Sequence, residues 1–82
     1  MPTVLRLGKL RVVIYTNDHR PAHVHVISPD GEAVFVLHCP KGPPELRESM
    51  GFALHELNRI VNHLQSALDK LCNQWSSIHG TH

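Results

Sequence analysis

The 82-residue sequence lacks several features that would define a class of protein at once. No stretch approaches the ~20 consecutive apolar residues that a membrane-spanning helix needs. The N-terminal segment has no long apolar core of the kind a signal peptide carries. Neither a P-loop nor a G-x-S-x-G nucleophile elbow is present. We therefore expect a single cytoplasmic domain with no membrane association, outside the commonest nucleotide-binding and serine-hydrolase classes.

Cysteine is scarce as well, because Cys39 and Cys72 are the only two. They lie far apart in the sequence and do not form a C-x-x-C pair. In a chain without a signal peptide we interpret them as free thiols rather than as a disulfide. Cys72 falls on the apolar side of a predicted helix, where we expect it to behave as a small buried hydrophobe.

Net charge is low, at +1 with neutral histidines, but it is unevenly placed. The first 25 residues carry Arg6, Lys9, Arg11 and Arg20 against a single acid, Asp18. The near-neutral total argues against a committed nucleic-acid binder, whereas the asymmetry leaves nucleic acid as a partner. Arg6 and Arg11 are accordingly predicted to contact an anion.

The first 38 residues are predicted to form four short strands from their alternating apolar residues. These strands run over Thr3 to Leu7, Leu10 to Tyr15, His23 to Ser28 and Ala33 to His38. Gly8-Lys9 has the glycine-first pattern of a two-residue hairpin turn. Both faces of the last strand are apolar, which indicates an inner strand or one covered at a dimer contact.

The second half is predicted to contain a loop and one helix. Residues 39–51 are rich in proline and glycine and indicate a loop, with a short helical turn allowed at Glu45 to Glu48. Residues 52–79 repeat apolar side chains at helical spacing, and Gly80 is the expected C-terminal cap. The heptad spacing also allows a homodimer through this helix. We therefore predict one α+β domain, a four-stranded mainly antiparallel sheet packed against one long C-terminal helix.

Chemically active side chains gather in one segment, and they form the candidate functional surface: Asp18, His19, Arg20, His23 and His25. His23 and His25 alternate with valines, so both imidazoles should project from the same face of a strand. In one interpretation they line a half-exposed sheet face, while Asp18 accepts backbone N–H groups in an Asx turn that Pro21 stiffens.

Two further interpretations of this segment remain open. His19, His23 and His25, with Asp18 beside them, offer three nitrogens and an oxygen to a divalent metal such as Zn, Ni or Fe(II). Alternatively, arginines that grip phosphate and histidines that exchange protons near neutral pH would suit a small metal-independent ribonuclease. That reading requires Arg6, Arg11 and the histidines to share a face, which the sequence leaves undecided.

Several segments together resemble a known family: Pro2-Thr3-Val4-Leu5-Arg6, Asn17-Asp18-His19 through Pro21 to His23-Val24-His25-Val26, Gly31-Glu32-Ala33, Gly51-Phe52, Glu56-Leu57 and Ile60. The sequence is similar to the small bacterial domain-of-unknown-function family numbered 4160. The resemblance implies a short cytoplasmic protein, often encoded beside another small protein, and some members are suspected toxin–antitoxin components. It implies no activity and no catalytic set. The chain departs from the pattern at Ala22, where a second proline is expected, and at Ala53, where a serine cap is expected.

Two functions from different classes follow. The first is a regulatory or interaction protein, one component of a toxin–antitoxin-like two-gene module that contacts a small protein partner or nucleic acid. The alternative is a small ribonuclease or divalent-metal-dependent hydrolase centred on the histidine cluster. The sequence favours a contact surface over an active site, and a divalent metal is the one cofactor it suggests.

Overall fold

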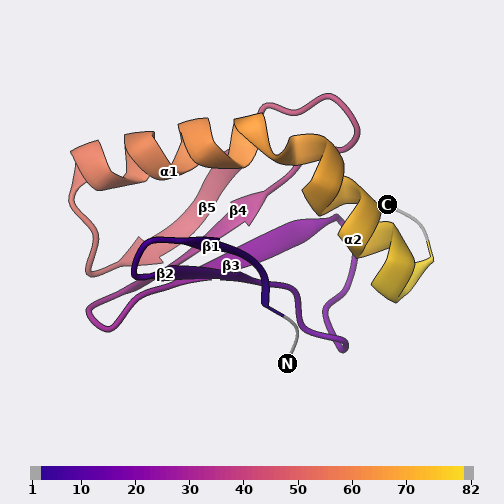
Figure 1. Ribbon diagram of the computed structural model, residues 1–82, viewed down its shortest axis with the longest axis horizontal. Coiled ribbons are helices and arrows are strands. Elements are labelled where there is room, and N and C mark those ends of the chain that lie inside the picture. The colour runs from indigo at the N-terminus through magenta and orange to yellow at the C-terminus, as the bar shows by residue number, and fades with distance from the viewer. Residues whose placement is uncertain (1–2, 81–82) are drawn as a thin grey trace.

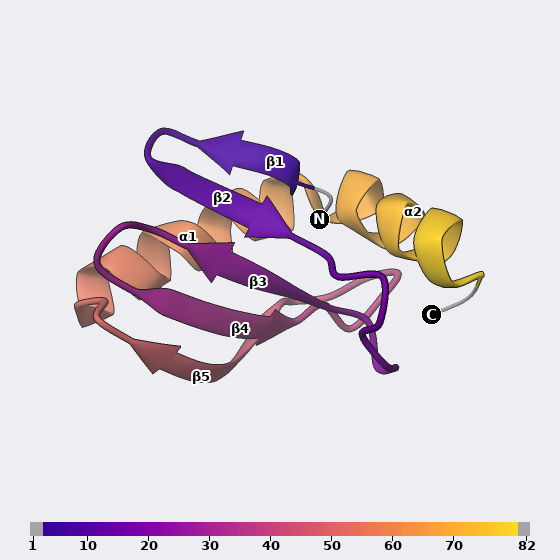
Figure 2. The same ribbon diagram turned by 90° about the horizontal axis from the view of Figure 1, so that it is seen from below.

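The computed structural model describes residues 3–80 as a five-stranded antiparallel sheet with two helices (Figures 1 and 2). The sheet is a meander in which the strands lie side by side in sequence order: β1 (Thr3–Leu7), β2 (Leu10–Val13), β3 (His23–Ile27), β4 (Glu32–Val36) and β5 (Glu45–Met50). The helices are α1 (Leu54–Ser66) and α2 (Leu68–His79). The predicted α+β class and antiparallel sheet are confirmed, whereas the prediction of four strands and one long helix was wrong. Pro2, part of the N-terminal motif, lies outside the described residues.

Strand β5 is the element that the sequence did not reveal. All six of its residues are exposed, so they show no alternation between a buried and a solvent face. The strand pairs with β4 through the backbone, and a bulge at Arg47 interrupts the register between Val34↔Glu48 and Phe35↔Leu46. Because β5 adds an edge, β4 is an inner strand, as its two apolar faces predicted.

Two glycines allow the turn after β3 to pack against the end of β5. Gly51 has a φ of +83°, and a Cβ atom there would collide with the carbonyl oxygen of Asp30. A Cβ atom on Gly31 would collide with the carbonyl oxygen of Met50. Backbone therefore lies directly on backbone at this corner, which no residue larger than glycine permits.

The predicted helix is divided at Ala67, whose φ of −107° and ψ of 15° are not helical. Ser66 Oγ donates to the carbonyl oxygen of Asn62 at 3.1 Å, a back-bond that bends helices. The apolar spacing continues through the break, which explains why periodicity alone predicts one helix. Gly80, with a φ of +85°, ends α2 as predicted. No helix among residues 3–80 is long and apolar enough to cross a membrane.

The core lies between the helices and one face of the sheet, as the two ribbon views show (Figures 1 and 2). Val12, Val26 and Ala33 lie directly opposite one another on neighbouring strands and belong to this core. Side chains alternate along each strand, so the residues on either side of this row point away from the core. We call the sheet face they occupy the open face.

Cys39 and Cys72 form a disulfide, which corrects the prediction of free thiols. Their Cα atoms lie 5.8 Å apart, within the usual range for a disulfide. Sequence spacing could not indicate this pairing, because the fold brings the loop after β4 against the buried side of α2. Cys72 is buried there, as expected.

Candidate functional site

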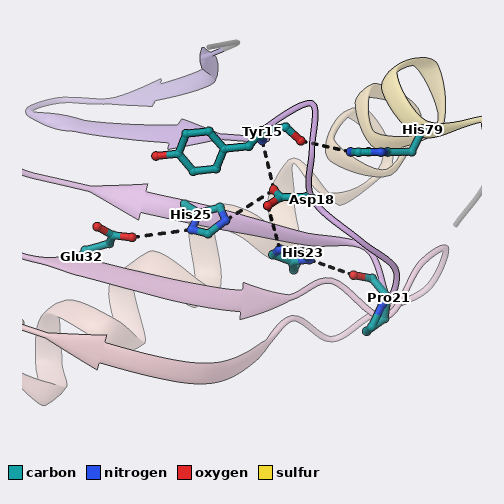
Figure 3. A network of polar contacts seen from close by, with 7 residues as sticks. All are labelled: Tyr15, Asp18, Pro21, His23, His25, Glu32 and His79. Carbon is teal, nitrogen blue, oxygen red and sulfur yellow. Dashed lines mark hydrogen bonds and ion pairs between the residues drawn. The ribbon is translucent and has the colours of Figure 1, made fainter.

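The connection between β2 and β3 folds back toward the open face and is closed by reciprocal contacts. Tyr15 N–H donates to Asp18 Oδ2 at 3.0 Å, and Asp18 N–H donates to the Tyr15 carbonyl oxygen at 3.1 Å. Asp18 thus accepts a backbone N–H, as predicted, but the donor lies three residues before it and not two residues ahead as in an Asx turn. The turn places the Asp18 carboxylate above the start of β3 (Figure 3).

The Asp18 carboxylate lies between the two imidazoles of β3. Its Oδ1 is 3.5 Å from His23 Nε2, and its Oδ2 is 3.4 Å from His25 Nε2 (Figure 3). One ligand-type atom from each of the three residues lies within 4.8 Å of the others. His23 and His25 share the open face, as strand alternation predicted.

Each member of the cluster is oriented by a further contact. His23 Nδ1 donates to the Pro21 carbonyl oxygen at 2.9 Å. A carbonyl can only accept, so Nδ1 carries the hydrogen of this bond, and Nε2 is the nitrogen that faces Asp18. His25 Nδ1 faces Glu32 Oε2 at 3.6 Å, and the Tyr15 N–H holds Asp18.

His25 is the residue with the least satisfied environment among those described. Both of its ring nitrogens are buried, and neither has a hydrogen bond. Its cross-strand neighbours Val13 and Val34 are buried and apolar. A buried polar group without a hydrogen bond costs about 1–3 kcal/mol. A histidine that served only to hold the loop would be expected to form such a bond.

The spacing of the cluster is somewhat wider than that of a filled metal site. Two ligand atoms that are each about 2.0–2.1 Å from a tetrahedral zinc ion lie roughly 3.3 Å apart. The separations of 3.5 Å to His23 and 3.4 Å to His25 are longer than good N–H···O hydrogen bonds, and they run to different oxygens of Asp18. One ligand atom from each of the three residues lies within 4.8 Å of the others, so the side chains would close further around a single ion. Two imidazole nitrogens and one carboxylate oxygen are also a donor set that zinc, nickel and iron(II) accept.

Helix α2 forms one wall of the site. The Trp75 ring lies 5.3 Å from that of His23, and His79 Nε2 donates to the Tyr15 carbonyl oxygen at 3.2 Å. On the other side, the Tyr15 ring lies 4.7 Å from His25. Sequence reasoning missed these three aromatic residues and Glu32, because only the tertiary fold and the strand register bring them to the histidines.

The remaining predicted residues lie elsewhere. His19 and Arg20 are exposed on the loop, and His19 is not part of the group that could hold a metal within residues 3–80. Arg6 and Arg11 are direct cross-strand partners in the β1–β2 hairpin, so they point to the same face. That face is the open face, because Arg11 is one residue from Val12 of the core and two from Val13, the partner of His25.

A cavity of about 650 Å³ lies at the opposite end of the sheet, between its turns and α1. Its cations Lys9 and Arg59 are balanced by Asp30 and Glu56. It contains none of the cluster residues, and its charges favour no ligand class. The candidate site is therefore the cluster on the open face.

The fold and this cluster define a small α+β protein with an aspartate–histidine site on the open face of a meander sheet. The model of the family described as "Domain of unknown function (DUF4160)" matches residues 10–76, and the chain belongs to that family. No curated protein and no solved structure matches the chain.

Proposed function

We propose that the protein binds one divalent transition-metal ion through Asp18, His23 and His25 and uses it for hydrolysis. The observation that carries this proposal is the convergence of the three side chains around a His25 ring that has no hydrogen bond. Of the four ligands that the sequence suggested, the proposed site keeps Asp18, His23 and His25 and leaves out His19. A cation between the carboxylate and the two ring nitrogens would satisfy all three at once.

The number of ligands favours a catalytic over a structural metal. Structural zinc sites are closed by four protein ligands, whereas catalytic sites have three and leave one position for water. The cluster offers three residues among those described. A metal held there would lower the pKa of a bound water to near neutrality and so supply a nucleophile.

The outer contacts support the same reading. Ligands in metal sites are held by second partners, often a carboxylate or a backbone carbonyl on the far nitrogen of a histidine. Pro21 O holds His23 in this way, and Glu32 faces the far nitrogen of His25. Tyr15 N–H fixes Asp18. The cluster thus has the support that a metal site needs before the ion arrives.

Calorimetric titration of chelator-treated protein with Zn²⁺ tests the proposal, with Co²⁺ absorption as a report on coordination geometry. We expect one equivalent of metal to bind, and Asp18→Asn or His25→Ala to weaken binding by more than about 100-fold, the upper range seen for outer-shell residues. His63→Ala removes an exposed histidine of α1 and is the matched control, while His19→Ala tests the ligand set that includes His19. Absence of saturable binding, or equal losses in ligand and control variants, would reject the metal site. Circular dichroism of each variant separates loss of ligand from loss of fold.

A second candidate is a regulatory protein of a toxin–antitoxin-like two-gene module that binds a small protein partner. The exposed apolar residues along β5 and the start of α1 favour it: Leu46 is 40%, Met50 78% and Leu54 73% exposed. The apolar stripe of the helices is used within the chain, so a partner or a second copy would contact these three residues instead.

Co-expression with a small protein encoded in an adjacent gene tests this second candidate. Size-exclusion chromatography should show a complex that Leu46→Ser with Met50→Ser dissociates and Gln65→Ser, on exposed α1 surface, does not. If expression of the chain alone arrests growth and His23→Ala with His25→Ala relieves the arrest, the cluster rather than the β5 surface carries the function. If the two proteins do not associate, the module interpretation is wrong.

A further inference from the structure

Arg6 and Arg11 place two positive charges next to each other, beside the cluster of Asp18, His23 and His25. They are direct partners across the β1–β2 hairpin, so their side chains leave the sheet together on the open face. Like charges directly opposite in an antiparallel pair destabilise it. Neither arginine has an ion-pair partner within residues 3–80. The pair is therefore available to an anion from outside the chain.

The strand register places this pair next to the histidines. Val13 lies opposite His25, and Arg11 is two residues before Val13, which makes Arg11 and His25 diagonal neighbours on the open face. Such neighbours have Cα atoms about 7–8 Å apart. An arginine side chain spans much of that distance, so one bound group can contact both the cluster and the Arg11 guanidinium.

Charge is distributed unevenly over the open face. Glu32 lies opposite Ile27, Glu48 opposite Val34 and Glu45 opposite Val36, all in rows that belong to the open face. The face is thus positive over β1 and β2 and negative over β4 and β5, with the cluster on β3 between them. An anionic ligand is repelled from the β4–β5 side and attracted toward the arginines.

We infer that the site takes phosphate esters, with Arg6 and Arg11 as the clamp for the phosphate oxygens; this inference rests on the proposed metal-dependent hydrolysis. The arginine guanidinium forms paired hydrogen bonds with phosphate, and two adjacent guanidinium groups match a group with several free oxygens. In the reaction, a water oxygen forms a bond to phosphorus while the bond to the ester oxygen breaks. The departing oxygen keeps the bonding electrons and takes a proton from that water. Water supplies all the atoms added, and no redox partner is involved.

Two measurements on protein loaded with one equivalent of Zn²⁺ test the inference. The first is calorimetric titration with inorganic phosphate. The second is hydrolysis of bis(p-nitrophenyl) phosphate, a diester, compared with p-nitrophenyl phosphate, a monoester, and p-nitrophenyl acetate, a carboxylic ester. The variant is Arg6→Gln with Arg11→Gln. The matched control is Lys41→Gln with Arg47→Gln, which removes the same charge from exposed positions in the loop after β4 and in β5.

We expect the Arg6, Arg11 variant to bind phosphate at least about tenfold more weakly, since a hydrogen bond to a charged group contributes about 1.5–3 kcal/mol. The KM for the phosphate ester should rise while Zn²⁺ affinity and acetate hydrolysis remain unchanged. The ratio of diester to monoester activity identifies which ester the clamp accepts.

If variant and control bind Zn²⁺ and have the same phosphate affinity, the proposed role of Arg6 and Arg11 is wrong, whereas the proposed metal site is supported. Phosphate binding that depends on the arginines in a protein that takes up no metal would overturn the proposed hydrolase and leave an anion site. A larger rate enhancement over the uncatalysed reaction for the acetate than for either phosphate ester would overturn the substrate class.

Discussion

At the scale of single residues, His25 is the central member of the proposed site. Its two ring nitrogens are buried, its cross-strand neighbours are two valines, and a carboxylate faces each nitrogen, at 3.4 and 3.6 Å. The Asp18 contact places it in the proposed metal site, and the Glu32 contact orients it from behind. Glu32 is half exposed and belongs to no part of the core, so it can be changed without disturbing the fold.

Replacing Glu32 with Gln should weaken Zn²⁺ binding by about tenfold, because the loss of an outer-shell carboxylate lowers the basicity of the histidine ligand. Glu48→Gln is the matched control, since Glu48 also lies on the open face but forms no ion pair with the cluster within residues 3–80. Both variants lose one negative charge. Equal Zn²⁺ affinities in the two calorimetric titrations would show that Glu32 acts only through long-range charge.

Replacing a glycine that has a positive φ costs free energy through backbone strain and, where another atom is close, through a steric collision. Gly8 and Gly51 allow the two terms to be measured separately. Gly8→Ala meets no atom within 4 Å, so it should cost only the conformational term of about 1–2 kcal/mol. Gly51→Ala adds a collision with the Asp30 carbonyl and should cost clearly more. Urea unfolding followed by circular dichroism measures both. If both variants lose the same free energy of unfolding, the turn after β3 can move away from residue 51 without a measurable cost.

At the scale of elements, α2 connects the site to the rest of the fold. The disulfide from Cys72 to Cys39 joins it to the loop after β4, while Trp75 and His79 on the same helix contact His23 and the Tyr15 carbonyl. Figures 1 and 3 show the C-terminal helix beside the β2–β3 connection. The position of α2 therefore bears directly on the geometry of the cluster.

Removing the disulfide by Cys39→Ser with Cys72→Ser should lower the free energy of unfolding by about 3–4 kcal/mol, because a cross-link across 33 residues restricts the unfolded chain. Reduction of the wild-type protein by dithiothreitol should produce a loss of the same size. The double variant should not respond to the reductant, which makes it the control. Urea midpoints that do not move in either case would mean that the cross-link does not contribute to stability.

At the scale of the whole molecule, the core is small and the stability of a domain of this size is marginal, on the order of 5–10 kcal/mol. An ion that binds only the folded state adds to that stability. At about 100 times its dissociation constant it contributes about 2.7 kcal/mol. For a chain of this length, that corresponds to a rise in Tm of roughly 10–20 °C.

Zn²⁺ at this excess should therefore raise the Tm of the wild-type protein and of His63→Ala by the same amount. His25→Ala should show no rise, because its site lacks one of the three ligands. Differential scanning fluorimetry with and without the metal, and again after chelation, measures the effect. A Tm that rises equally in His25→Ala would place the stabilising ion elsewhere on the chain.

Local patterns were sufficient for much of the fold and for part of the site. Alternation along residues 23–26 placed His23 and His25 on one face, and Gly8 and Gly80 marked a turn and a helix end, because these features depend on neighbours in the chain. That Asp18 accepts a nearby backbone N–H was also predictable, although the donor is Tyr15 before it and not a residue two positions ahead, as an Asx turn requires. These expectations are confirmed by the structure.

The sequence by itself determined the class of the fold, the face of the two histidines and the helical stripe that covers the sheet, because each depends on short-range periodicity. Only the tertiary structure decided four things: the fifth strand, the break at Ala67, the disulfide, and the shared face of the arginines and histidines. The strand β5 has no buried face to leave a pattern, and the disulfide joins residues that meet only after the chain has folded. The cluster likewise depends on a loop closing over a strand, which brings Asp18 rather than His19 to the histidines.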